Sequence, residues 1–261
     1  MKLAITGKGG VGKTTLVSLM AYIYADMDMH VLAIDADPSP CLGPALGVPP
    51  DVLQALTPIA EMEDLIYERT GAQPGTVGGY FKLNPRVDDI PDRFSVMHRG
   101  IRLLQLGAVE TGGSGCICPE SALLRALTTH ILLRRDDVVL LDMYAGVEHL
   151  GRATADAVDA MIIVVEPSGR SLDTARQIQS LANDIGIRRL YLVGNKVHAE
   201  EDRAFIDRRS PVPVLGHLPY TPKAQAADRD GQAAYDAVPE LVEAARAIVR
   251  ELQQAIGDAA G

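Results

Sequence analysis

The sequence lacks the features of membrane-spanning and nucleic-acid-binding proteins. None of its apolar runs approaches the length needed to cross a bilayer. Positive charge is scarce, and the formal net charge of the 261 residues is -9. DNA and anionic lipid both require a clustered positive field, whereas the paired arginines at 134–135, 188–189 and 208–209 are scattered, as at solvated helix ends. We therefore expect neither a nucleic-acid partner nor a membrane partner.

Cysteine is also scarce, with three residues in the chain. No secretory leader is recognisable, because a candidate catalytic motif lies within the first ten residues. The expected location is the cytoplasm, where three cysteines do not form a disulfide framework and close spacing indicates metal or redox chemistry. Low-complexity tracts, fixed-period repeats and linkers are absent, so we expect one domain over residues 1–256 and a disordered tail at 257–261.

A glycine-rich phosphate loop occupies residues 7–15, which read Gly-Lys-Gly-Gly-Val-Gly-Lys-Thr-Thr between an apolar run and a helical pattern. Its glycines let backbone N–H groups close around phosphate oxygens, and the helix N-terminus adds partial positive charge. Lys13 is expected to neutralise phosphate charge and Thr14 to ligate Mg²⁺. The expected nucleotide contacts are Gly9, Gly10, Val11, Gly12, Lys13, Thr14 and Thr15.

Short apolar runs alternate with helical patterns along the chain, which is typical of a parallel sheet covered on both faces. The runs are Leu3–Thr6, Val31–Ile34, Leu103–Leu106, Val138–Leu141, Met161–Val165, Leu190–Val193 and the edge-like Val212–Leu215. They predict a doubly wound α/β fold with a mostly parallel sheet, whose functional loops lie at the carboxyl ends of the strands. Residues 44–100 are less regular, and we interpret them as an insertion covering the nucleotide edge.

Carboxylates follow two of these runs. Asp35 and Asp37 come after the second run, and their spacing of two residues lets both address the phosphate and metal region. The fourth run ends in Asp142, which we expect to hold Mg²⁺ through water, and Gly146 follows as a backbone N–H donor to the γ-phosphate. Such a loop would distinguish ATP from ADP, because the γ-phosphate contact disappears on hydrolysis.

Lys8 is additional to the ordinary phosphate loop and lies on its outer lip, where it is poorly placed to serve its own phosphates. The arrangement resembles the deviant Walker A ATPases, a branch of the P-loop NTPases that includes MinD, ParA and the nitrogenase iron protein. The resemblance implies ATP hydrolysis to ADP and phosphate in a homodimer closed around two ATP molecules, with Lys8 reaching the partner's phosphates. It also implies that Asp37 orients or activates the attacking water and that Asp35 supports the Mg²⁺ shell. Lys8, Lys13 and Asp37 are thus the expected catalytic residues.

Two segments near the end of the chain look like the base-recognition site of this family. The segment with Asn195 and Lys196 follows the sixth run, and in the family an asparagine amide there addresses adenine. Asparagine is also common after strands simply because it favours turns. Pro219 and Tyr220, after the last run, resemble the second wall of that pocket.

A Cys-x-Cys pair, Cys116 and Cys118, lies just before a helix expected to begin at Pro119. A helix N-terminus favours thiolate, the metal-binding form of cysteine. Two sulfurs do not complete a tetrahedral or square-planar site, but two copies of the loop at a symmetric interface would supply four. The expected ion is Ni²⁺ or Zn²⁺. Other interpretations stay open: thiols without a role, or a site within one chain completed by His98, His130 or His149.

Together, the loop, the switch segment and the cysteine pair resemble the branch of this family that inserts nickel into carbon monoxide dehydrogenase. The resemblance implies ATP-dependent nickel delivery, with that enzyme as client. Cys41 also matches the branch, although a lone cysteine is more often a small buried residue. Tyr144 departs from it, because glutamate is expected there. The competing functions are a ParA/MinD-type partitioning or positioning ATPase without a metal role, and an iron-containing electron donor.

Overall fold

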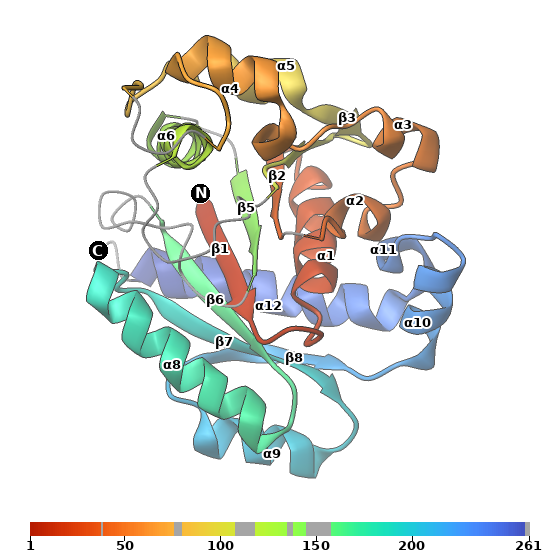
Figure 1. Ribbon diagram of the computed structural model, residues 1–261. Coiled ribbons are helices and arrows are strands. Elements are labelled where there is room, and N and C mark those ends of the chain that lie inside the picture. The colour runs from red at the N-terminus through yellow and green to blue at the C-terminus, as the bar shows by residue number, and fades with distance from the viewer. Residues whose placement is uncertain (38, 76–79, 108–117, 135–137, 145–157, 259–261) are drawn as a thin grey trace.

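A central sheet organises the computed structural model, which describes residues 1–37, 39–75, 80–107, 118–134, 138–144 and 158–258 (Figure 1). The sheet has eight strands in the order β3-β4-β2-β5-β1-β6-β7-β8. β3 pairs antiparallel with β4, and the other pairs are parallel. The strands are Lys2–Gly7 (β1), Val31–Ala36 (β2), Val96–His98 (β3), Ile101–Gln105 (β4), Val138–Met143 (β5), Ala160–Val165 (β6), Leu190–Val197 (β7) and Val214–Pro219 (β8).

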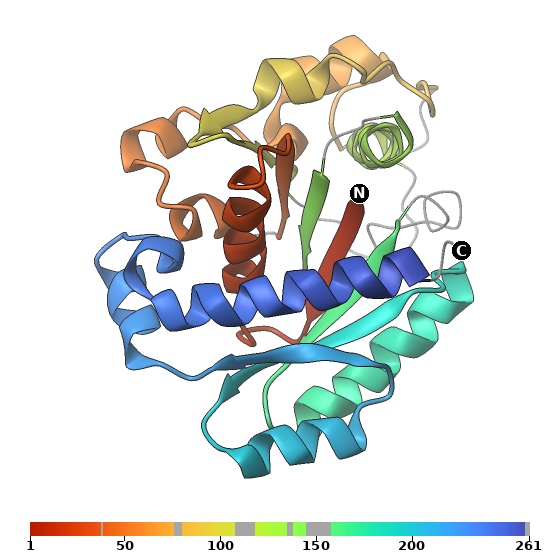
Figure 2. The same cartoon turned by 180° about the vertical axis from the view of Figure 1, so that it is seen from behind.

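Helices cover both faces of this sheet. α1 and α12 lie on one face, and α6 and α8 lie on the other (Figures 1 and 2). The helices are Lys13–Ala25 (α1), Leu42–Ala45 (α2), Pro50–Gln54 (α3), Glu63–Thr70 (α4), Ile90–Phe94 (α5), Pro119–Arg134 (α6), Gly169–Ile185 (α8), Glu200–Arg209 (α9), Pro222–Arg229 (α10), Ala234–Ala237 (α11) and Pro239–Asp258 (α12), with a 3₁₀ turn at Ile59–Glu61 (η1). This arrangement confirms the predicted doubly wound α/β fold.

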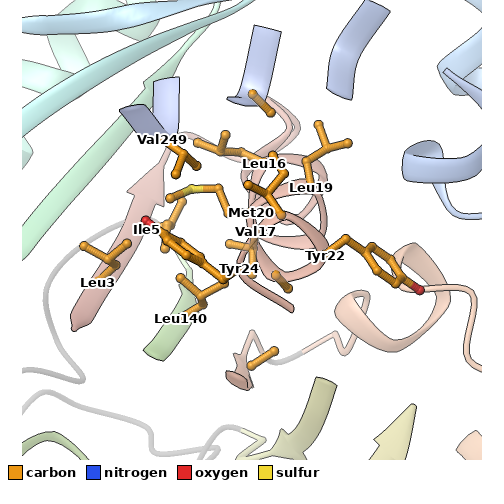
Figure 3. Packing of buried hydrophobic residues seen from close by; sticks show 14 of the residues in the cluster. Leu3, Ile5, Leu16, Val17, Leu19, Met20, Tyr22, Tyr24, Leu140 and Val249 are labelled. Carbon is orange, nitrogen blue, oxygen red and sulfur yellow. The ribbon is translucent and has the colours of Figure 1, made fainter. Parts of the chain in front are cut away.

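Side chains that point alternately to the two faces of the sheet divide the interior into two cores. Leu3 and Ile5 of β1 join the core beneath α1 and α12, whereas Ala4 between them joins the core beneath α6 and α8. Successive strand side chains point to opposite faces, so a fully apolar strand can fill both cores. Figure 3 shows the first core, in which Leu3, Ile5 and Leu140 converge on α1.

The structure departs from the prediction at the last strand, at one edge of the sheet and at the end of the last helix. The last strand is β8 rather than Val212–Leu215, because Pro211 and Pro213 flank Val212 and proline has no N–H to donate to a strand ladder. The edge strand β3 was not expected, since its three residues carry no readable period. α12 continues through Asp258, past the expected start of the tail, because a helix ends where its hydrogen bonds fray rather than at its last apolar residue. Residues 259–261 lie outside the described part of the chain.

Residues 44–100, expected to cover the nucleotide edge, contribute to two regions of the fold. β3 extends the sheet at one edge, and α4 packs against α6 through core residues such as Leu65 and Leu127. The buried Arg69 guanidinium donates to both oxygens of Asp89 at 2.9 and 2.8 Å, which joins α4 to the start of α5. Within the described residues, no helix is both long and apolar enough to span a bilayer.

Candidate functional site

The phosphate loop joins β1 to α1 at the carboxyl edge of the sheet. Gly12 is the N-cap of α1 with φ of 92°, a left-handed conformation that favours glycine. A Cβ at this position would lie 2.1 Å from Nδ2 of Asn195, so space as well as backbone conformation requires glycine. The loop therefore brings its backbone close to β7 at the N-terminus of α1, and a helix N-terminus is a favourable position for phosphate.

The two lysines of the loop occupy different environments. Lys13 is 6% exposed, and its ammonium donates to the carbonyl oxygen of Lys8 at 3.3 Å. Lys8 itself is half-buried. Lys13 is therefore held at the centre of the loop, where a phosphate would replace the carbonyl as its partner.

Asp142 and Thr14 form the candidate Mg²⁺ site. The Thr14 hydroxyl donates to Oδ2 of Asp142 at 2.7 Å, from the first turn of α1 to the end of β5. Asp142 is 1% exposed, and burial raises its pKa to about 7 despite the opposing effects of the Thr14 hydrogen bond and the Lys13 charge. A hydroxyl and a buried carboxylate lacking a cation fit Mg²⁺, which prefers hard oxygen ligands and keeps several waters.

Asp35 is placed beside Asp142 in the strand register but is already satisfied by backbone donors. Its carboxylate accepts from the N–H groups of Asp37, Cys41 and Leu42 at 3.2, 2.9 and 2.8 Å. Burial raises its pKa to about 6, and these hydrogen bonds oppose the increase. In this structure, Asp35 organises the turn that carries Asp37, a function that the sequence pattern did not reveal.

Asp37 remains available at the edge of the site. It is half-buried, and its Oδ1 accepts from the N–H of Ser39 at 3.0 Å. Cys41, in the same turn, is exposed, and its thiol donates to the carbonyl of Ser39 at 3.1 Å. Burial and the neighbouring carboxylates raise the pKa of Cys41, which keeps it a thiol.

A pocket of about 240 Å³ opens beside the phosphate loop, where a base would extend from the phosphates. The structure brings together there the predicted residues Gly12, Thr15, Asn195, Lys196, Pro219 and Tyr220. Tyr220 stacks on His198 with ring centroids 4.2 Å apart, which fixes the outer wall. The predicted base-recognition residues therefore share one cavity with the phosphate loop.

Asn195 and Lys196 hold the phosphate loop as well as lining the pocket. Nδ2 of Asn195 donates to the carbonyl of Val11 at 2.7 Å, and its Oδ1 accepts from the N–H of Lys196 at 2.8 Å. The Lys196 ammonium donates to the carbonyl of Gly10 at 2.6 Å from a left-handed residue with φ of 57°. The Asn195 amide is thus committed to the loop in this structure rather than presented freely to a base.

Sequence reasoning missed the wall formed by α10, α11 and the start of α12. Its lining residues are Thr221, Ala224, Gln225, Asp228, Gln232, Ala234 and Leu241. A local signal was present, because Thr221 caps α10 and Pro222 follows at the first helical position. Such a helix start directly after a strand marks the carboxyl edge of the sheet, where ligands bind.

Cys118 lies immediately before α6, as predicted. Its side chain is 2% exposed, and its thiol donates to the Ser121 hydroxyl at 3.0 Å. Cys116, Gly146 and His149 lie outside the described residues. Within the described ranges, no group of three or more histidine, cysteine, aspartate or glutamate side chains is arranged to hold a metal ion, so His98 and His130 form no such site there.

Tyr144 follows Asp142 at the end of β5. Its side chain is 53% exposed, and its carbonyl accepts from the Thr6 hydroxyl at 3.3 Å. This backbone contact joins the end of β5 to β1. The phenol ring is therefore directed outward rather than used in the interior of the site.

The comparisons with known proteins agree with this geometry. The family model of the CobQ/CobB/MinD/ParA nucleotide binding domain matches residues 2–234. The carbon monoxide dehydrogenase accessory protein CooC of Rhodospirillum rubrum is 49% identical over 262 residues, covering 100% of this chain and 99% of that protein. An uncharacterised ATP-binding protein of Methanocaldococcus jannaschii is 47% identical, covering 84% of this chain and 85% of that protein.

Solved structures show the same fold. The septum site-determining protein MinD of Pyrococcus horikoshii, complexed with Mg-ADP, superposes with a TM-score of 0.67 at 19% identity, covering 98% of this chain and 96% of that chain. The family match extends from β1 to the start of α11, beside the nucleotide pocket. This chain therefore belongs to the CobQ/CobB/MinD/ParA family of P-loop nucleotide-binding proteins.

Proposed function

We propose that this P-loop ATPase dimerises around ATP and delivers nickel to a carbon monoxide dehydrogenase during maturation of that enzyme. The observation that carries the proposal is the 49% identity over the whole chain to CooC, whose name assigns it to this enzyme. The Cys-x-Cys pair before α6 supplies sulfur donors for the cargo. The proposed location is the cytoplasm, where a reducing environment keeps these thiols free for metal.

The arrangement around the phosphate loop supports hydrolysis. Mg²⁺, held near Thr14 and Asp142, would neutralise charge on the phosphates. Lys13 contributes a second positive charge from the centre of the loop, and Asp37 is at the edge where it could orient water. Gly146, outside the described residues, is proposed to contact the γ-phosphate. The chain supplies position and charge, and the phosphoryl group passes to water without a covalent intermediate.

Lys8 is proposed to act across the dimer interface. Replacing it with alanine should slow phosphate release by about a hundredfold, because a positive charge at the transferring phosphate would be lost. ADP binding by the single chain should change by less than about threefold, because Lys13 provides the charge within the chain. Phosphate release measures hydrolysis, titration with labelled ADP measures nucleotide binding, and sedimentation with ADP or ATP reports dimerisation. The exposed Lys82→Ala variant is the control.

Either of two results would contradict this function of Lys8. One is a Lys8→Ala variant that hydrolyses ATP and dimerises like the wild type. The other is a variant that loses ADP binding as completely as Lys13→Ala does. The second result would place Lys8 in its own subunit's nucleotide site.

The cysteine pair is proposed to hold Ni²⁺ or Zn²⁺ between two subunits. The Cys116→Ala/Cys118→Ala double variant should lose stoichiometric metal binding while keeping ATP binding, because only the sulfur donors are removed. Equilibrium dialysis with metal analysis should give about one ion per two wild-type chains. The Cys41→Ala variant is a matched control, because this cysteine is exposed and lies in the turn beside Asp37.

Buried Cys118 adds a condition to this proposal. Since its side chain is 2% exposed in the single chain, metal bridging requires the start of α6 to uncover the sulfur. Delivery is excluded if the wild type binds no metal at micromolar concentrations with or without ATP. Such a result would favour the competing ParA/MinD-type positioning function, which needs the same ATPase site and no metal.

A further inference from the structure

The inner wall of the nucleotide pocket is built on a very short helix. Gln232 and Ala234 line the pocket, and Ala234 begins α11. This helix has four residues, and none of them is buried. One helical turn is not stable through its own hydrogen bonds, so its position depends on contacts with the rest of the protein.

Aromatic and polar contacts join α11 to α1. The Tyr235 ring stacks on the Tyr22 ring with centroids 4.7 Å apart and an interplanar angle of 26°. The Tyr235 hydroxyl donates to Asp26, and Arg246 of α12 donates to Asp26 at 2.7 Å and to the Tyr235 hydroxyl at 2.8 Å. Tyr22 projects from the side of α1 opposite Leu3 and Leu140 (Figure 3), so its ring is free to meet α11.

Arg99 holds the same helix from the turn between β3 and β4. Its guanidinium donates to both oxygens of Asp236 at 2.6 and 2.9 Å. Its central carbon also lies 4.5 Å from the centroid of the Tyr22 ring, a cation–π contact, and Nη1 donates to the Tyr22 hydroxyl at 3.3 Å. Arg99 is not among the residues that line the pocket. It therefore contacts both Asp236 of α11 and Tyr22 of α1 from outside the pocket lining.

The backbone of Arg99 is unusual for arginine. Arg99 and Gly100 have φ of 48° and 82°, and they connect the paired residues His98 and Ile101. Two-residue turns with both φ values positive favour Asn-Gly or Gly-Gly, because a β-carbon is disfavoured in this conformation. An arginine kept there indicates that its side chain has a function beyond closing the turn.

We propose that Arg99 is a positioning residue for nucleotide binding, which fixes α11 through Asp236 and Tyr22 and thereby sets the inner wall of the base pocket. The bidentate geometry matters more than the strength of the ion pair, because a pair exposed at 46% and 50% adds little stability by itself. The base subsite therefore depends on Arg99, whereas the phosphate subsite does not. This inference concerns nucleotide affinity and is independent of metal delivery.

The variants Arg99→Ala and Arg99→Gly test the proposal in the full-length protein. Titration with fluorescently labelled ADP should show a Kd raised about three- to tenfold, which corresponds to the loss of one ordering contact. Competition by inorganic tripolyphosphate should stay within about 1.5-fold of wild type, because it engages the phosphate loop without the base pocket. The KM for ATP should rise with the Kd while kcat changes by less than about twofold.

Two comparisons separate positioning from general destabilisation. Arg99→Gly removes the side chain but relieves the left-handed backbone, so its thermal midpoint should not fall below that of Arg99→Ala while nucleotide affinity falls equally. Arg93→Ala is the matched control, because Arg93 also pairs with an aspartate and lies over a ring, yet it belongs to α5 and its partners are Asp89 and Phe94 rather than residues of α11. Its nucleotide affinity should equal that of the wild type.

Asp236→Asn should reproduce the weaker ADP binding, since the NH₂ group that replaces one carboxylate oxygen is a donor and cannot accept from the guanidinium. The proposal is overturned if the Arg99 variants bind ADP as tightly as the wild type. It is equally overturned if they lose affinity for ADP and tripolyphosphate in parallel, because a positioned base wall would spare the phosphate subsite.

Discussion

Replacing Asp142 with asparagine is expected to slow ATP hydrolysis by at least about a hundredfold and to stabilise the nucleotide-free protein. The loss of activity follows because the amide cannot supply the negative charge that holds Mg²⁺ near the phosphates. The gain in stability follows because Asp142 is 1% exposed and its ionised form is unfavourable there without a cation. One substitution thus separates the catalytic requirement from the folding requirement.

The stability difference should depend on pH. The pKa of Asp142 is about 7 in the folded protein, so it keeps its proton up to that pH, whereas the unfolded chain releases the proton near the ordinary carboxyl pKa of 3.8. Because the folded state binds more protons between these values, wild-type stability falls as pH rises through this window. The asparagine variant has no proton to release at this position. Its free energy of unfolding should therefore exceed that of the wild type above about pH 4, by on the order of 2 kcal/mol at pH 8. This gain in stability is reduced because, in the variant, the Thr14 hydroxyl donates to an uncharged amide instead of a carboxylate.

Urea unfolding at pH 5 and pH 8 in EDTA, together with phosphate release in Mg²⁺, checks both effects. Asp173→Asn is the control, because this carboxylate is 71% exposed and forms an i,i+3 pair with Arg176. It should alter neither measurement appreciably. An Asp142→Asn variant that is less stable than wild type at pH 8 would show that the carboxylate is stabilised within the fold by contacts beyond Thr14.

Replacing Gly12 with alanine is expected to destabilise the nucleotide-free protein by about 3 kcal/mol. One contribution to the destabilisation is backbone strain, because alanine disfavours the left-handed φ of 92°. The other is steric overlap of the new Cβ with Nδ2 of Asn195, 2.1 Å away. Asn195 is 7% exposed and bonded to Val11, so it cannot move aside without losing that hydrogen bond. Nucleotide affinity should fall by about a hundredfold or more, because loop and base pocket meet at this contact.

Gly10→Ala is the matched comparison within the same loop. Gly10 also has a positive φ, 79°, but a Cβ there would meet no heavy atom of the described residues within 4 Å. Backbone strain alone should cost about 1 kcal/mol in the nucleotide-free protein. Urea unfolding of the two variants measures the difference. Equal destabilisation would mean that contact between the loop and β7 does not require glycine at position 12.

The phosphate loop was predictable because its chemistry lies in consecutive residues. The spacing of Gly12, Lys13 and Thr14 after a strand is a local pattern, and the structure places Gly12 at the N-cap of α1 and the other two in its first turn. The carboxyl edge of the sheet was predictable for a related reason. Apolar runs that alternate with helices imply parallel strands, and parallel strands end at one edge, where Asp35 and Asp142 become register neighbours.

The functions of several residues in the same site were not predictable. Asn195 follows the expected strand, but its contact with Val11 joins positions separated by 184 residues. Asp35 was expected to support the Mg²⁺ shell, and the pattern did not predict that its carboxylate accepts from three backbone N–H groups. The sequence pattern shows that a polar group lies at a strand end and does not show which neighbour it will bind.

The sequence by itself determined the succession of strands and helices along the chain, the phosphate loop and the carboxylates that follow the strands. These features depend on periodicity and short spacings. Only the tertiary structure decided which groups meet: Arg99 and Asp236 are separated by 137 residues, and a four-residue helix acquires its place from that contact. Side-chain pairing of this kind follows from packing of distant elements, and no local pattern encodes it.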